Sequence, residues 1–169
     1  MNDDSSTCTD KATATAAKTL PRSARWLGLA GLAPHVLLIA ALLADPERFG
    51  PTPAGVALVY AGLILSFVGG AWWGLVSQST AMVHGAVWIA AVTPSLIALA
   101  TSGAWAIGVP VGAPLWITGG ALIGTLAVDR RLVADGVAPR GWLGLRVPLS
   151  LGLGALTILI AIVSQRPPG

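Results

Sequence analysis

Few residues in this chain could carry chemistry, and two of them are histidines. His35 falls within a long apolar segment, and His84 stands at the start of another. Two imidazoles on different membrane helices can ligate a haem iron, and a single intramembrane histidine can relay protons. The expected depths of the two residues differ, so we expect neither haem nor any other cofactor. For His35 we weigh a proton relay against a packed, neutral imidazole hydrogen-bonded to a backbone carbonyl.

Four other polar residues are candidates for function. Asp129 follows the fourth apolar segment and Arg146 begins the fifth. We hypothesise that they form an ion pair joining the two segment ends; the alternative is ordinary solvated charge. Tyr60 and Ser66 could hydrogen-bond between helices or line a polar pore. The sequence contains no HExxH, GxSxG, P-loop or GxGxxG motif, so we predict no enzyme and neither catalytic nor metal-binding residues.

Small residues recur along the segment that holds Tyr60. Gly62, Ser66, Gly70 and Gly74 are spaced by four, and Gly69 widens the same helix face. Such a stripe lets another helix approach closely. The alternative is chance spacing, because glycine is frequent in this chain, with 21 in 169 residues. We predict a packing seam that faces either another helix of this chain or another protomer. Its candidate partners on later segments are Gly120, Gly124, Ser150 and Gly154.

The composition is that of a membrane protein. The chain is 54% hydrophobic and 10% charged, with a mean hydropathy of +0.77. Soluble domains carry about 25% charged residues, whereas a bilayer solvates apolar side chains directly. The net charge is +3, but the basic residues stand at the edges of apolar runs rather than in one patch. We therefore expect the lipid bilayer as the partner and exclude nucleic acid.

Five apolar segments predict an all-α, polytopic membrane helix bundle with five transmembrane helices. Each has about 19 to 24 residues, enough to cross a hydrocarbon core of about 30 Å, and none carries a charged residue away from its ends. The segments are residues 26–44, 54–77, 83–101, 105–128 and 145–163. They make a membrane domain over 26–163, between a disordered tail (1–25) and a short C-terminal tail (164–169).

Prolines, tryptophans and turn residues refine these spans. Thr101-Ser102-Gly103 predicts a tight turn, and residues 129–144 predict the longest polar connection. Pro94, Pro110 and Pro114 can kink or interrupt helices; if Pro110 ended a re-entrant piece, the chain would have four or six spans. Tryptophans near the segment ends predict an aromatic belt at the membrane surfaces. They are Trp26, Trp72, Trp73, Trp105 and Trp142.

The basic residues predict the orientation. Eight of the ten Lys and Arg fall in the N-terminal tail and in or beside the 129–146 connection, and the other two are Arg48 and Arg166. Cytoplasmic loops carry the excess of basic residues, so the N-terminus is expected in the cytoplasm and the C-terminus outside.

Several stretches together resemble the transmembrane protein 69 family, a family of small membrane proteins whose domain has no known function. The resemblance covers about residues 26–162, and its most specific part is YAGLILSFVGG at 60–70 with Trp73-Gly74. The other matching pieces are GLAGLAP at 28–34, TPSLI at 93–97, Asp129, Trp142 and Leu145-Arg146. The resemblance implies five helices and a bacterial inner membrane, or alternatively a mitochondrial inner membrane. It implies no activity.

Three classes of function fit these observations. The first is a non-enzymatic accessory or assembly component of an inner-membrane complex, acting through a membrane-protein partner or as a homo-oligomer. The second is a small transporter or channel, in which the prolines would mark broken helices. The third is a membrane enzyme acting on lipid or quinone, for which the 129–146 connection is the candidate region. We favour the first, because the sequence offers a packing seam and no catalytic motif.

Overall fold

The computed structural model describes residues 22–44, 52–79, 85–139 and 141–165, and within these ranges it contains helices and no strand. The predicted tails fall largely outside them. The helices are α1 (Arg22–Ala30), α2 (Ala33–Ala44), α4 (Thr52–Ser77), α5 (Gly85–Ala106), α6 (Gly112–Ala134) and α7 (Trp142–Ser164).

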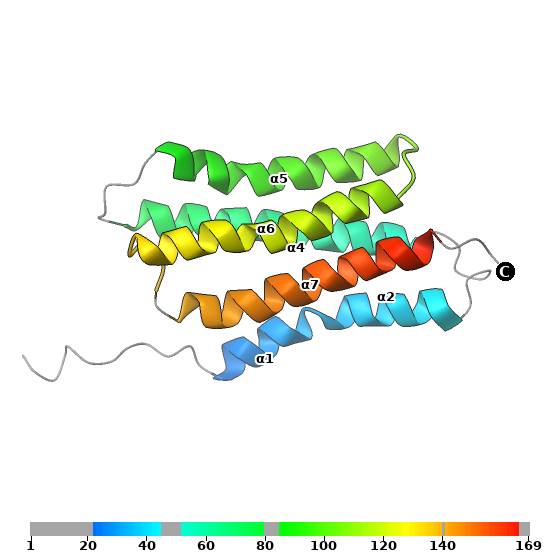
Figure 1. Cartoon of the computed structure of the whole chain (residues 1–169), viewed down its shortest axis with the longest axis horizontal. Helices are drawn as coiled ribbons and strands as arrows, with labels where there is room; N and C mark the ends of the chain where they lie inside the picture. The colour runs from blue at the N-terminus through cyan, green and yellow to red at the C-terminus, as the bar shows by residue number, and fades with distance from the viewer. Residues whose placement is uncertain (1–21, 45–51, 80–84, 140, 166–169) are drawn as a thin grey trace, which may run out of the picture.

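The helices form one bundle whose successive crossings run in opposite directions (Figure 1). Within the described ranges, four helical segments are long and apolar enough to cross a membrane: Trp26–Ala44, which combines most of α1 with α2, and α4, α5 and α7. The predicted fold class, an all-α membrane helix bundle, is confirmed. Helix α6 is not among the four, yet it lies alongside them and packs mainly on α7 (Figure 1). The count of five spans and the cytoplasmic N-terminus stay predictions.

The first predicted segment is not one continuous helix. It breaks at Gly31 and Leu32, between α1 and α2. Pro34 explains the break, because its ring has no N–H for the carbonyl of Ala30 and would clash with it in a regular helix. In Figure 1 α1 bends away from the line of α2.

The turn between the third and fourth segments lies later than predicted. Helix α5 runs through Thr101-Ser102-Gly103, and the hydroxyl of Thr101 donates back to the carbonyl of Ile97 at 2.9 Å. The chain turns instead at Gly108, whose φ of +97° is a left-handed conformation that glycine adopts without strain.

The predicted fourth segment begins too early, because Trp105 and Ala106 still belong to α5 and helix α6 starts only at Gly112. Pro110 lies in the connection before α6, and Pro114 lies in the first turn, where helix N–H groups have no intrahelical acceptor. Pro94 is inside α5, as predicted, and Pro148 is inside α7.

Helix α6 ends six residues later than the predicted fourth segment, at Ala134 rather than at Val128. It continues through Asp129, Arg130 and Arg131 to Ala134, because the side chains of Asp129 and Leu132 are buried inside the bundle. The polar connection to α7 is therefore 135–141 rather than 129–144. This extension carries a charged residue into the interior of the bundle.

Candidate functional site

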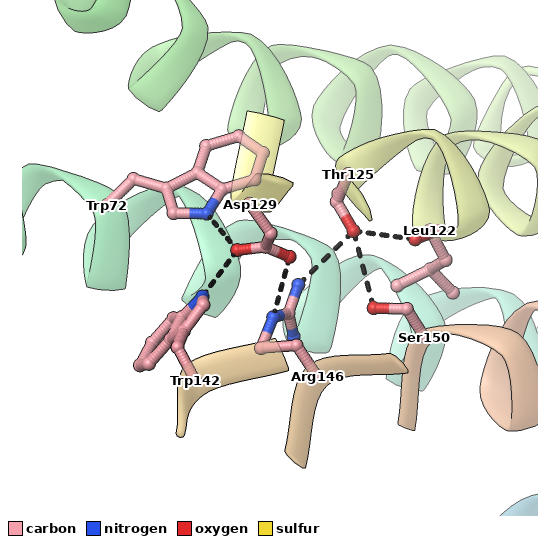
Figure 2. A network of polar contacts seen from close by, with 7 residues as sticks. All are labelled: Trp72, Leu122, Thr125, Asp129, Trp142, Arg146 and Ser150. Atoms are coloured by element: carbon pink, nitrogen blue, oxygen red, sulfur yellow. Dashed lines mark hydrogen bonds and ion pairs between the residues drawn. The ribbon is translucent and has the colours of Figure 1, made fainter. Parts of the chain in front are cut away.

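A polar cluster within the described interior surrounds Asp129, near the end of the bundle where α6 finishes and α7 begins (Figures 1 and 2). Its carboxylate is fully buried and accepts hydrogen bonds from two other helices. The indole N–H groups of Trp72 on α4 and Trp142 on α7 donate to Oδ1 at 2.8 and 2.7 Å. Nε of Arg146 donates to Oδ2 at 3.0 Å. The predicted pairing of Asp129 with Arg146 is therefore present in the structure.

Arg146 extends this cluster along α7 toward the middle of the bundle. Its Nη2 donates to the hydroxyl of Thr125 at 3.2 Å, and the side chain is only 11% exposed. The Thr125 hydroxyl donates to the carbonyl of Leu122 at 2.6 Å. Ser150 contacts the same Thr125 oxygen at 3.4 Å, which is long for a hydroxyl hydrogen bond (Figure 2). We call Trp72, Thr125, Asp129, Trp142, Arg146 and Ser150 the Asp129 cluster.

The hydrogen bonds of the Asp129 carboxylate fit a role in holding helices together better than a role in proton transfer. The carboxylate accepts three hydrogen bonds, one of them from a guanidinium, and such charge-assisted bonds fix the positions of donor and acceptor. Acid and base neutralise each other, so the interior carries no net charge at this point. The three donors come from α4 and α7, so the carboxylate on α6 joins three helices at one end of the bundle.

Trp72 has a different role from the one predicted. The sequence predicts both Trp72 and Trp73 in an aromatic belt at the membrane surface. Trp73 is 49% exposed, but Trp72 is 2% exposed and points at Asp129. Sequence reasoning missed this contact, because the two residues are 57 positions apart. Thr125 was missed as well, since a lone threonine in an apolar helix carries no special signal.

His35 lies in a separate polar contact between α2 and α7. It is fully buried, and its Nε2 is 3.1 Å from the hydroxyl of Thr157. Because that hydroxyl gives its proton to the carbonyl of Leu153 at 2.7 Å, Nε2 is the donor to Thr157. The packed-imidazole prediction has a backbone carbonyl as the partner, whereas in the structure the partner is the hydroxyl of Thr157. Nδ1 of His35 has no hydrogen-bond partner within the described residues, and His84 lies outside them.

Tyr60 stabilises the break between α1 and α2. Its hydroxyl donates to the carbonyl of Gly31 at 2.8 Å, and its ring centroid is 5.5 Å from that of His35. The helix break frees the Gly31 carbonyl, so Tyr60 supplies a partner that the backbone lacks there.

Tyr60→Phe should therefore destabilise the fold modestly, by about 1 kcal/mol, since interhelical hydrogen bonds in membranes average about 0.6 and reach about 1.7 kcal/mol. The measurement is the midpoint of unfolding in a detergent titration. Val59→Ala, at a neighbouring half-exposed position, is the control. Equal stability of Tyr60→Phe and the wild type would show that the Gly31 carbonyl needs no partner.

The packing seam in the structure contains fewer residues than the predicted stripe of small residues. Gly62 and Gly69 are buried against α5, where a Cβ on Gly62 would lie 3.4 Å from that of Ala98. Ser66 and Ser95 share a hydrogen bond of 2.9 Å between their hydroxyls. The partner is thus an internal helix, α5, and none of the candidates on α6 or α7.

Gly70 and Gly74 stand apart from this seam. A Cβ at either position would meet no atom within 4 Å in the described part of the chain. Another close contact, which the sequence did not reveal, joins Gly119 on α6 to Gly154 on α7. A Cβ on Gly119 would lie 3.0 Å from the Gly154 carbonyl oxygen, and one on Gly154 would lie 2.9 Å from that of Gly119.

Comparison with known proteins places this bundle in a family. The model of the family described as "Protein of unknown function (DUF3429)" matches residues 20–162. The chain belongs to this family. The match includes every residue of the Asp129 cluster, together with His35 and Tyr60. No match was found among the curated proteins or among the solved structures. The chain is thus a multi-pass membrane protein of a family whose activity is not known.

Proposed function

We propose that this protein acts through contacts, as a non-enzymatic accessory or assembly component of a complex in the bacterial inner membrane. The observation that supports this role is the bonding of Asp129. Its carboxylate is buried and bonded to two other helices, so this buried charge is used to hold the bundle together. A bundle held together in this way offers its outer surface to partners.

The outer surface provides room for such contacts. Gly70 and Gly74 leave open space on α4, beside the exposed side chains of Phe67 and Trp73. Small residues on an outward helix face allow another helix to approach closely. The occupant in this proposal is another membrane protein or a second copy of the chain. The resemblance to the transmembrane protein 69 family belongs to the same proposal, as does the choice of a bacterial over a mitochondrial membrane.

Purification of the tagged chain from its native membrane in mild detergent tests this role. We expect a stoichiometric membrane-protein partner, identified by mass spectrometry, or a defined homo-oligomer. Gly70→Leu should reduce recovery of that partner, whereas the same change at Gly103, which also has open space around it on α5, should not. A clean monomer under gentle extraction would contradict an accessory role.

Five spans with a cytoplasmic N-terminus also belong to this proposal. Cys8 is the single cysteine of the chain, so a membrane-impermeant thiol reagent should label it only after the membrane is opened. In a Cys8→Ser background, Gly169→Cys should be labelled from the outside of intact cells. The same accessibility at both ends would mean an even number of spans and would contradict the proposed topology.

A small transporter is the second candidate, and His35 favours it. The residue is buried within a membrane helix, and its Nδ1 has no hydrogen-bond partner within the described residues. Such a group can accept and release a proton along a pathway. Proton flux into liposomes that is present with the wild type and lost in His35→Gln would favour transport over the accessory role.

A further inference from the structure

A cavity lies between the first crossing and the rest of the bundle. Its volume is about 210 Å³, and its walls come from α1, α4, α6 and α7. Leu32, Ile64 and Leu153 are among the apolar side chains that line it. The break at Gly31 contributes to this space, because α1 bends away from the line of α2 there (Figure 1). Leu27 and Phe67, which are 75% and 73% exposed, also line the cavity and mark its mouth.

One end of the cavity is polar. Arg146 and Ser150 line it there, and both are hydrogen-bond donors. Arg146 uses Nε for Asp129 and Nη2 for Thr125, which leaves Nη1 without a partner among the described residues. Ser150 is 2% exposed, and its contact with Thr125 is 3.4 Å long (Figure 2). A ligand with an acceptor oxygen at this end would satisfy both groups better than they are satisfied within the chain.

The charge balance of the Asp129 cluster indicates whether the acceptor group of the ligand is neutral or anionic. Asp129 already neutralises Arg146, so an anionic ligand would add an uncompensated charge to a site with little water. A neutral carbonyl oxygen can accept from Nη1 and from the Ser150 hydroxyl without that cost. From Arg146 the cavity extends along α7 to Leu153, seven residues or about 10 Å at 1.5 Å per residue. The ligand therefore combines a neutral carbonyl with an apolar chain.

The position of Arg146 along the membrane-spanning helix indicates which molecule supplies the carbonyl. Arg146 lies in the second turn of α7, close to Trp142, near one end of a helix long enough to cross the membrane. This level corresponds to the boundary between headgroups and hydrocarbon, where phospholipid ester groups lie. We propose that the cavity binds one acyl chain of a membrane phospholipid, whose ester carbonyl accepts hydrogen bonds from Arg146 and Ser150.

A comparison of two lipids tests the site. The full chain is washed free of lipid in mild detergent and mixed with equal amounts of two phosphatidylcholines of the same chain length. One has ester linkages and the other has ether linkages, which lack the carbonyl. Native mass spectrometry should detect one bound lipid per chain, with the ester form preferred roughly fivefold, the effect of about one hydrogen bond.

Three variants locate the binding within the cavity. Ser150→Ala should weaken the preference for the ester form. Ile64→Trp should fill the cavity and remove the bound lipid, whereas Leu63→Trp, on the adjacent exposed position outside the cavity lining, should retain it. A thermal melt of each variant separates loss of binding from loss of folding.

Several results would overturn the proposal. One is equal binding of the ester and ether lipids by the wild-type chain, which is decisive even if Ile64→Trp does not fold. Another is an ester preference that survives in a folded Ile64→Trp variant. The third is a quinone that co-purifies with the chain and displaces the phospholipid, which would assign the cavity to a different carbonyl ligand.

Discussion

Asp129→Asn is expected to lower the free energy of unfolding by about 3 kcal/mol or more, the range seen when one partner of a buried ion pair is removed. The amide can still accept from the indoles of Trp72 and Trp142. It cannot neutralise Arg146, whose guanidinium would remain buried at 11% exposure without an anion. The NH2 group of the asparagine is itself a donor, so it would face another donor, such as Nε of Arg146, with no acceptor between them. The measurement is unfolding in an SDS titration, together with the melting temperature in mild detergent.

Asp135→Asn provides the matched control for this result. Asp135 is the residue that follows α6, only six positions after Asp129, and it is exposed. Its substitution should change stability by less than about 0.5 kcal/mol, as surface changes generally do. If both variants lost the same small amount, the carboxylate of Asp129 would not be the tie between α4, α6 and α7.

The double variant Asp129→Leu with Arg146→Met separates the charge from the packing. Removing both charges leaves no ion uncompensated, so the double variant should be more stable than the single variant Asp129→Leu. It should not reach the wild type, because the indole N–H groups of Trp72 and Trp142 would then lack their acceptor. A double variant no more stable than Asp129→Leu would contradict the ion-pair explanation.

Gly69→Ala should destabilise the protein by about 1 to 3 kcal/mol, the usual range for overpacking in a tightly packed interior. A Cβ at Gly69 would collide with the carbonyl oxygen of Ala91, which belongs to the backbone of α5. A backbone atom cannot turn aside as a side chain can, so α4 and α5 would have to separate. Unfolding in an SDS titration measures the loss.

The next residue in the chain supplies the control for this prediction. Gly70→Ala adds the same methyl group where it would meet no atom of the described chain within 4 Å. Helix propensity favours alanine over glycine by up to about 1 kcal/mol, so Gly70→Ala should be neutral or slightly stabilising in the isolated protein. Destabilisation of both variants by a similar amount would mean that α4 tolerates no methyl group at all, and the contact with Ala91 would not be the cause.

The sequence was sufficient for the class of the protein and for most of its helices. Apolar runs of membrane-spanning length predict helices, because a bilayer leaves a single chain segment no other way to satisfy its backbone. Pairing of Asp129 with Arg146 was also accessible, since opposite charges flank a single connection between two segments. The helix limits were less accurate: the first segment broke at Gly31, and α5 and α6 extended past their predicted ends.

Only the tertiary structure decided which face of each helix points inward. In a soluble protein, polar residues mark the outer face, but lipid and protein interior are both apolar, so a membrane helix carries little such pattern. Gly69 and Gly70 are neighbours of the same type, yet one is buried against Ala91 and the other is open. Trp72 likewise meets Asp129 across 57 positions. Both outcomes depend on the rotation of α4 about its axis, which is set by packing against other helices rather than by its own residues.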